Sequence, residues 1–355
     1  MSQLDRRSTS PVARIGPAPV GVRVRSTLTP IYHSLRELPS LGPEYVRAES
    51  RRSERPPWMV LGDALASTLQ YGTTFSEFCQ FGFASRSSAE RKQYITTRRY
   101  QRYFALMNDP GSAHLLEDKI RFHAHFKDLT GRPALPASDL GTGRSEEERI
   151  FDGGWAVAKP RYGRRGEGVV VISLSSWDPA RLRTELVNRG LELIEGYVVQ
   201  HPDLADVSAS GVNTIRVMTQ VHSEGIDVLA ARLKLTNGGL VDNVRLGGLV
   251  APVDLETGRV VGPARGLDPH AVAHEVHPLS GAQIEGFAVP HWNATLELAR
   301  EAAARVPTIR SVGWDIAVTP SGPVVIEGNH RFSRSVWQVP TGRGHADEIL
   351  RFAAV

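Results

Sequence analysis

The sequence has only one cysteine, Cys79, and it has no long apolar run. A single cysteine excludes an intrachain disulfide and favours a reducing compartment. No apolar stretch approaches the roughly 20 residues that a membrane helix needs, so no membrane span is expected. Because no regular targeting segment is found either, we expect a cytoplasmic protein. The apolar neighbours of Cys79 favour core packing over a role as a nucleophile.

The chain has 355 residues, of which 41% are hydrophobic and 23% charged. This length allows two core-bearing units, or one large enzyme built from subdomains. The net charge of +4 and the pI of about 9.3 suit anionic ligands such as nucleotides and carboxylates. The arginines are spread along the chain rather than interleaved with aromatics in one stripe, so no nucleic-acid partner is expected.

Composition divides the chain into regions of different character. Residues 1–57 are rich in proline, arginine and serine, which predicts a flexible or loosely packed arm. Residues 58–127 show apolar positions at helical spacing, which predicts a small helical N-terminal domain. Short β-branched runs then alternate with helical stretches, which predicts an α+β fold. The expected strands cover residues 156–158, 169–172, 197–200, 213–221, 228–235, 312–319 and 324–327, and the expected helices cover residues 178–189 and 293–305.

A glycine-rich, basic turn separates the first two expected strands. It follows Lys159 and contains Gly163, Gly166 and Gly168. Glycines let backbone N–H groups approach a polyphosphate, and a lysine at a strand end can neutralise its charge. The turn is not a Walker A loop, because no Gly-Lys-Ser/Thr opens a helix there. Taken alone, it is better interpreted as an ordinary hairpin.

The two last expected strands carry acids among apolar neighbours. Asp315 lies in one strand, and Glu327 and Asn329 lie at the end of the other. In a hairpin of this length Asp315 can face Glu327, while the two-residue period places Glu327 and Asn329 on one side. Two carboxylates and a carboxamide oxygen suit Mg²⁺. Buried acids without a cation are costly, so a magnesium site is preferred over capped strand ends.

Polar and cationic side chains also lie within two middle strands. Asn213 and Arg216 belong to one, and Arg232 and Lys234 to the next. Cationic side chains on one face of a sheet commonly meet phosphate or carboxylate. A polar loop with paired glycines follows at residues 242–248. Individually, these residues also fit solvated strand positions.

In this order, the elements resemble the ATP-grasp superfamily over roughly residues 60–340. The strings Gln200-His201-Pro202, Val212 to Arg216 and Gly313-Trp314-Asp315 are typical of its sugar-transfer-associated branch. The loop of residues 242–248 and the closing hairpin are similar, more distantly, to RimK-like glutamate ligases. The resemblance implies two α+β subdomains that grip ATP. Residues 128–200 would carry the glycine-rich phosphate loop, and residues 201–355 the metal site.

The resemblance also implies roles for individual residues on the nucleotide side. Two lysines would grip the α- and β-phosphates under a glycine-rich lid, and a hinge would read adenine through its backbone. An acid just after the hinge would hold the ribose, for which Asp206 is an alternative to Asp203. The implied nucleotide-binding positions are Lys119, Lys159, Gly163, Arg165, Gly166, Gly168, Val198, Val199, Gln200, Asp203 and Lys234.

On the reaction side, the resemblance implies two magnesium ions held by Asp315, Glu327 and Asn329. Catalytic roles fall on Arg216 and Arg232, together with the metal ligand Asn329. The implied substrate-binding residues are Asn213, Asn243, Arg245, His330 and Arg331.

The implied activity is that of an ADP-forming ligase that joins a small-molecule carboxylate to an amine through an acyl phosphate. A kinase acting on a small-molecule hydroxyl and a non-catalytic nucleotide-binding subunit are the alternatives, and a homodimer stays open. The sequence departs from many relatives before residue 115, where no α/β domain is expected, so the substrate cannot be carried over.

Overall fold

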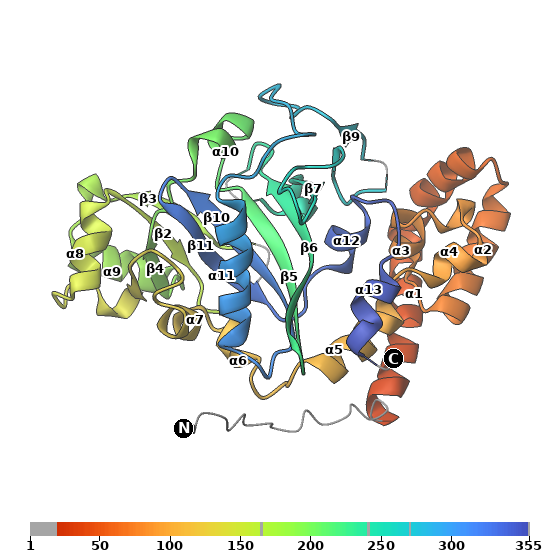
Figure 1. Cartoon of the computed structure of the whole chain (residues 1–355), viewed down its shortest axis with the longest axis horizontal. Coiled ribbons are helices and arrows are strands. Elements are labelled where there is room, and N and C mark those ends of the chain that lie inside the picture. The colour runs from red at the N-terminus through yellow and green to blue at the C-terminus, as the bar shows by residue number, and fades with distance from the viewer. Residues whose placement is uncertain (1–19, 164–165, 240–241, 270, 354–355) are drawn as a thin grey trace, which may run out of the picture.

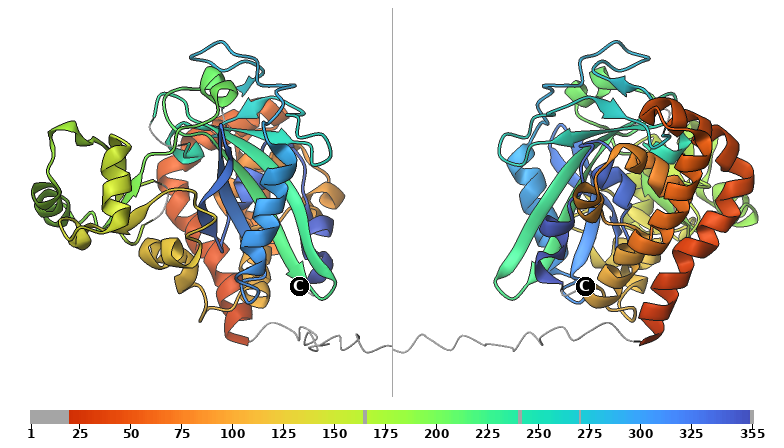
Figure 2. Two further views of the ribbon diagram at one scale, coloured as in Figure 1. Left: turned by 60° about the vertical axis from the view of Figure 1, so that its left-hand side comes forward. Right: turned by 90° about the vertical axis from the view of Figure 1, so that its right-hand side faces the viewer.

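The computed structural model of the chain describes residues 20–163, 166–239, 242–269 and 271–353. This part of the chain consists of a helical unit, a small sheet and a large sheet (Figure 1). The small sheet and the helical unit lie on opposite sides of the large sheet, and the further views show the small sheet projecting from the body (Figure 2). The α+β prediction is confirmed.

The first helix corrects the prediction of an arm over residues 1–57, of which residues 1–19 lie outside the described residues. α1 (Val20–Ser53) is helical for 34 residues although it contains three prolines. It packs against α2 (Pro57–Tyr71), α3 (Phe75–Gln80) and α5 (Thr97–Met107). Packing of this kind outweighs the low helix propensity that composition indicated. Two short helices, η1 (Phe83–Ser85) and α4 (Ser88–Lys92), complete the helical unit.

An aromatic core holds the helical unit together. Cys79 is fully buried there among Phe75, Phe78, Phe83 and Tyr94. Burial raises the pKa of the Cys79 thiol, so it stays protonated at neutral pH. The expected packing role of this cysteine therefore fits its surroundings.

The small sheet is antiparallel, with strands in the order β1-β4-β2-β3. Two helices, α8 (Ser145–Asp152) and α9 (Pro179–Asn188), pack with it, and Asp178 caps the second. The predicted strand at residues 197–200 is wrong, because the strand β4 ends just before it. The bounds are β1 (Ala134–Pro136), β2 (Trp155–Lys159), β3 (Val170–Ser173) and β4 (Leu193–Gly196), with η2 (Ala137–Asp139) and η3 (Leu174–Ser176) between them.

The large sheet has seven antiparallel strands in the order β11-β10-β5-β6-β7-β8-β9. The four strands expected for it from the sequence are all present. Their bounds are β5 (Thr214–His222), β6 (Gly225–Leu235), β7 (Leu249–Val253), β8 (Ala264–Arg265), β9 (Ala273–His274), β10 (Ser311–Thr319) and β11 (Gly322–Asn329). The remaining helices are α6 (His114–Glu117), α7 (Lys119–His125), α10 (Pro202–Val207), η4 (Val244–Leu246), α11 (Trp292–Ala304), α12 (Arg334–Gln338), α13 (Ala346–Ile349) and η5 (Leu350–Phe352).

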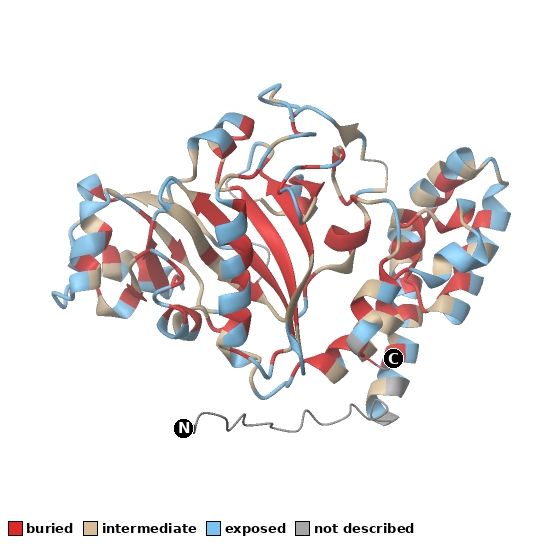
Figure 3. Ribbon diagram, in the orientation of Figure 1, coloured by how far each residue is buried: buried red, intermediate tan, exposed pale blue. Residues whose placement is uncertain are grey.

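The two faces of the large sheet have different partners. On one face, Ile215 and Val217 of β5 pack with α11, which crosses the sheet in Figure 1. On the other face, Met218 packs with α5, α12 and α13. Because side chains alternate along a strand, the polar positions Arg216 and Asp315 face this second side. The burial pattern in Figure 3 shows the strands of this sheet as the most buried part of the chain.

The helices α6 and α7 belong with the sheets rather than with the helical unit. α6 packs against β11, and α7 packs against β1. Residues 114–125, which fall within the predicted helical domain of residues 58–127, thus contact the sheets. Among the described residues, no helix combines the length and apolarity needed to cross a membrane.

Candidate functional site

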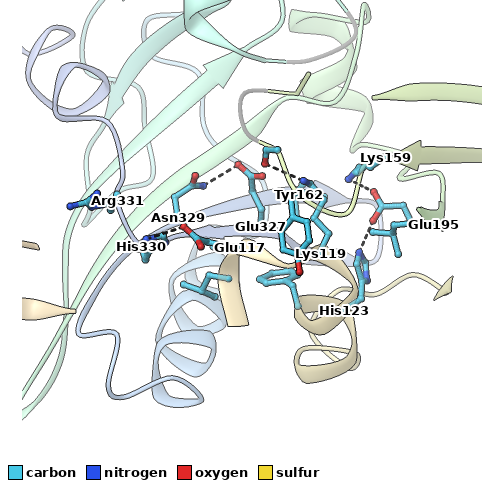
Figure 4. A pocket seen from close by; sticks show the side chains of 16 residues that line it. Glu117, Lys119, His123, Lys159, Tyr162, Glu195, Glu327, Asn329, His330 and Arg331 are labelled. Atoms are coloured by element: carbon cyan, nitrogen blue, oxygen red, sulfur yellow. Dashed lines mark hydrogen bonds and ion pairs between the residues drawn. The ribbon is translucent and has the colours of Figure 1, made fainter. Parts of the chain in front are cut away.

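A cavity with a volume of about 420 Å³ lies between the two sheets and reaches the helical unit. A neighbouring recess of about 310 Å³ shares part of its wall (Figure 4). Residues of both sheets and of α5 line the cavity. The residues common to both hollows are Lys119, Lys159, Gly163, Glu195, Ile326, Glu327, Asn329 and Arg331.

The hairpin of β10 and β11 places two acids on the wall of the cavity. Asp315 pairs with Glu327, and the next pair is Ile316 with Val325, so Ile326 forms a β-bulge. Because of this extra residue, Val325 points into the apolar core while Glu327 faces the cavity with Asp315. The predicted facing of the two acids is confirmed.

Asp315 is surrounded by cations. Arg216 Nε lies 2.5 Å from Asp315 Oδ1, and Arg216 Nη2 lies 2.6 Å from Oδ2. Lys234 Nζ lies 3.2 Å from the same Oδ2 and 2.9 Å from Asp242 Oδ1. Although burial alone would raise it, the charges of Arg216 and Lys234 hold the pKa of Asp315 well below its usual range. Asp315 is therefore a carboxylate at any physiological pH.

Glu327 has fewer partners than Asp315. Asn329 Nδ2 donates to its Oε1 at 3.0 Å. Burial, followed by repulsion from Asp315, raises the pKa of Glu327. A site that is unfavourable for a second negative charge is stabilised by a cation between the two acids.

The donor set at this hairpin fits Mg²⁺. Glu327 offers carboxylate oxygens, and Asn329 keeps its carbonyl oxygen when its amide donates to Glu327. Asp315 would share its oxygens with Arg216 and Lys234. Mg²⁺ takes one or two protein carboxylates and completes its shell with phosphates and water, so this set is sufficient. Across the described residues, no group of three or more His, Cys, Asp and Glu side chains forms a metal site without the asparagine.

The opposite wall carries a second buried acid, Glu195 of β4. Its Oε2 lies 2.6 Å from His123 Nε2 and 3.0 Å from Arg132 Nη2, and its Oε1 forms an ion pair with Lys159. The charges of Arg132 and Lys159 outweigh the effect of burial and hold the pKa of Glu195 well below its usual range. Figure 4 shows this cluster at one end of the recess and Arg331 at the other.

Lys119 stands between the two acidic walls. Its Nζ donates to the carbonyl oxygen of Gly163 at 3.1 Å, which ties it to the glycine-rich turn. Burial, opposed by the charge of Glu327, lowers its pKa. Asp118, just before it, caps the start of α7 and accepts 3.0 and 2.7 Å hydrogen bonds from Arg161. The turn is thus fixed to the N-terminus of this helix.

The glycine-rich turn forms part of the cavity wall. Gly163 and Gly166 line the cavity, and both have the positive φ that favours glycine, 139° and 73°. Gly168 does not line it and packs against Pro160 instead. Arg165 lies outside the described residues.

The cavity end next to β2 and β3 is apolar. Ala156 and Ala158 of β2 point into the core of the small sheet, so Val157 faces the cavity. Val171 of β3 and Val198 of the segment after β4 add to this wall. We refer to this end as the apolar slot, and such a wall suits the ring of a heterocyclic base.

Several expected site residues lie elsewhere and hold the local structure. Gln200 and Asn213 hydrogen-bond to each other at 2.9 Å, and Asn213 is fully buried. Arg232 faces the same side of the sheet as Arg216, but its guanidinium donates to the carbonyl of Trp337 at 2.8 and 3.1 Å.

Val199 and Asp203 are exposed and do not line the cavity. His330 lines only the recess, where its Nε2 lies 3.5 Å from Glu117 Oε1, whereas Asn243 and Arg331 line the cavity. The side chain of Arg245 lies outside what the structure describes.

Sequence reasoning missed Glu195, Asp242, Tyr100 and Arg334. Glu195 carries a readable signal, because it is an acid in an otherwise apolar strand, as Asp315 and Glu327 are. Tyr100 and Arg334 line the cavity through contacts between segments far apart in the chain, so no local pattern marks them.

The family described as sugar-transfer associated ATP-grasp matches residues 98–353. A search of curated proteins gave no match. A RimK domain ATP-grasp protein from Sphaerobacter thermophilus is 14% identical, with a TM-score of 0.39, over 69% of this chain and 70% of that chain.

Two ligases of known structure are similar at the same level. The L-amino acid ligase from Bacillus licheniformis is 14% identical, with a TM-score of 0.39, over 68% of this chain and 48% of that chain. The D-alanine–D-alanine ligase from Bacillus anthracis is 12% identical, with a TM-score of 0.38, over 68% of this chain and 67% of that chain. The chain spans about half the length of the L-amino acid ligase.

The family match covers most of the chain, from α5 to the C-terminal helices. It includes both sheets and every wall of the cavity. The prediction of an ATP-grasp fold preceded by a helical region is confirmed. The chain belongs to the sugar-transfer associated ATP-grasp family.

Proposed function

We propose that the protein binds Mg·ATP in this cavity and joins a small-molecule carboxylate to an amine through an acyl phosphate. One observation carries the proposal. The incompletely neutralised pair of Asp315 and Glu327 faces Lys119 across a cavity that runs from an apolar slot to the exposed Arg331. In that order, the apolar slot, Lys119, the two acids and Arg331 would contact the base, the phosphates, the metal and the acid substrate.

On the nucleotide side, adenine would lie in the slot between Val157, Val171 and Val198. Lys119 and Lys159 would pair with the phosphates, with the turn at Gly163 and Gly166 closing over them. Lys159 then exchanges part of its ion pair with Glu195 for phosphate. Because Glu195 keeps Arg132 and His123 as partners, it stays compensated during that exchange.

Magnesium bound by Glu327 and Asn329 would neutralise charge on the transferred phosphate. Arg216 and Lys234, held rigid by Asp315, add fixed positive charge beside the γ-phosphate. Such charges need no reorganisation during the reaction, which makes them effective in a partly dry site.

The reaction has two balanced steps. A carboxylate oxygen of the substrate forms a bond to the γ-phosphorus, and the bond between that phosphorus and the β-γ bridging oxygen breaks, which releases ADP. The amine nitrogen then attacks the acyl carbon and loses a proton to water, while phosphate leaves with the bonding electron pair. No side-chain nucleophile is required.

The test is an incubation with Mg·ATP, a pool of carboxylates and hydroxylamine, analysed by mass spectrometry. A hydroxamate formed together with ADP would support acyl phosphate formation and would identify the acid. A stable phosphorylated product with ADP would instead indicate a kinase. Failure to bind ADP in the presence of magnesium would overturn the proposal.

A further inference from the structure

The end of the cavity that lies away from the apolar slot is built jointly by the helical unit and the large sheet. Tyr100 of α5 lines it together with Arg331, Ser333 and Val336, which follow β11. Val244 belongs to η4, before β7, and Leu267 follows β8. We refer to these six residues as the acid pocket.

Arg331 supplies positive charge to the acid pocket and has no ionic partner in the part of the chain that the structure describes. Among the cationic side chains of the cavity, Lys159 pairs with Glu195, Arg216 pairs with Asp315, and Lys234 pairs with both Asp315 and Asp242. The exposed guanidinium of Arg331 forms no hydrogen bond or ion pair with any residue that the structure describes. An arginine that lines a cavity without a carboxylate partner suits an anionic ligand.

The helical unit fixes the backbone around Arg331. The hydroxyl of Tyr100 donates to the carbonyl oxygen of Arg331 at 3.0 Å. Arg334 forms an ion pair with Glu77 of α3, donates to Thr97 Oγ1 at 2.7 Å and stacks over the ring of Tyr100 at 4.8 Å.

Glu77 is itself fixed by the N–H groups of Thr74 and Thr97, each at 3.0 Å. Arg334, at the start of α12, therefore connects the helical unit to the segment that follows β11. Arg331 is left to meet a ligand.

The floor of the acid pocket is apolar. Val244, Leu267 and Val336 are each no more than 6% exposed and belong to one hydrophobic cluster. An apolar floor gives a hydroxyl group no hydrogen-bond partner, so a polyhydroxylated ligand would lose its hydration there without replacement. An alkyl or aromatic group would instead gain from burial.

We propose that the acid pocket binds the carboxylate substrate and selects an acid whose body is a short alkyl chain or a single aromatic ring. This inference rests on the proposed function and adds the substrate class. Arg331 pairs with the carboxylate, Tyr100 holds the backbone of Arg331, and the apolar floor excludes sugar acids.

The test compares four acids at equal concentration: isovalerate, phenylacetate, gluconate and glucuronate. Acid binding is measured by isothermal titration to the protein loaded with magnesium and a non-hydrolysable ATP analogue. Activation is measured in parallel, as hydroxamate formed with Mg·ATP and hydroxylamine. We expect the two apolar acids to bind at least about tenfold more tightly than the two sugar acids.

Two variants assign the effect to named residues. Arg331→Gln should weaken binding of the apolar acids about tenfold or more, while Arg331→Lys restores part of it. Val336→Thr keeps the shape of the side chain but adds a hydroxyl. It should raise the KM for apolar acids and reduce the difference in affinity between apolar acids and sugar acids. The control is Arg300→Gln, on the exposed side of α11, which should change none of these values.

The outcomes separate this inference from the proposed function. Tighter binding of sugar acids than of apolar acids, or no effect of Arg331→Gln on acid binding, overturns the acid pocket even if ATP is turned over. No binding of any of the four acids also overturns it. Failure of the nucleotide analogue to bind counts against the proposed function alone, because acid binding can then be measured on the nucleotide-free protein.

Discussion

Two acids, the buried Glu195 and the half-buried Glu327, face each other across the cavity and have opposite electrostatic surroundings. Glu195, on the small sheet, contacts Lys159, Arg132 and His123. Glu327, on the large sheet, accepts a hydrogen bond from the amide of Asn329, forms no ion pair with the residues that the structure describes, and lies beside a second acid, Asp315. The pKa of Glu195 is lowered by its cations, and the pKa of Glu327 is raised by burial and by Asp315.

The difference shows how burial alone fails to indicate a role. An acid with several cationic partners orients those cations and contributes to folding. An acid beside another acid is unfavourable in the free protein and becomes favourable when a ligand brings positive charge. The small sheet therefore presents a finished ionic cluster, whereas the large sheet presents a site that a metal would complete.

The largest expected effect is on folding, from Glu195→Gln. The substitution leaves Lys159 and Arg132 buried without their shared carboxylate, so we expect a loss of about 3–5 kcal/mol in the free energy of unfolding. Urea denaturation measures it. The matched control is Glu185→Gln, whose exposed ion pair with Arg189 is 3.8 Å long and should contribute less than about 1 kcal/mol. Equal unfolding midpoints for the two variants would contradict the assigned role of Glu195.

The next effect is on activity, from Glu327→Ala. Loss of the metal carboxylate should lower ADP release by about 100-fold or more, while the fold is retained. The loss of activity is measured as the rate of ADP formation with Mg·ATP. The control is Glu297→Ala, on the exposed face of α11. Normal turnover of Glu327→Ala would show that the metal assignment is wrong.

A third acid, Glu49 of α1, tests whether the number of cationic partners decides the direction in which the pKa of an acid shifts. It is buried, and only Arg52 pairs with it among the described residues, so burial raises its pKa to about 6 from its usual 4.5. The folded state therefore holds the proton more tightly than the unfolded state. Stability from this group should fall by on the order of 1–2 kcal/mol as pH rises from about 4.5 to 6.

The measurement for Glu49 is urea unfolding of wild type and Glu49→Gln at several pH values. The difference in unfolding free energy should shift in favour of the variant as pH rises through this window. The opposite trend is expected for Glu195→Gln, because the lowered pKa of Glu195 adds stability that is lost as pH falls. If the unfolding free energies of both variants changed in the same direction relative to wild type as pH rises, the contrast drawn between these acids would be wrong.

The smallest expected effect comes from Cys79→Ala. The side chain is enclosed by aromatic rings and its thiol stays protonated, so the kcat and KM of ATP turnover should not change. The variant should lose only about 1 kcal/mol of stability, measured as a lower Tm. Loss of activity without loss of stability would give this cysteine the chemical role that its neighbours argue against.

Much of the large sheet was predictable, because its strands carry β-branched runs bounded by turns. The facing of Asp315 and Glu327 followed from hairpin length, although the bulge at Ile326 that secures it has no mark in the sequence. The helix α1 was not predictable from composition, since its stability comes from packing against α2, α3 and α5. Asn213 and Arg232 were plausible ligands in sequence, but the fold uses both for internal hydrogen bonds.

The sequence by itself determined the positions of six strands along the chain, the acids of the closing hairpin and Lys159 before the glycine-rich turn. Local periodicity and residue chemistry are enough for these features. Only the tertiary structure decided which cations are already neutralised and which, like Arg331, have no ionic partner among the described residues. It also decided that the helical unit forms a wall of the cavity through Tyr100. Pairing of charges depends on distances between segments far apart in the chain, and those distances exist only after folding.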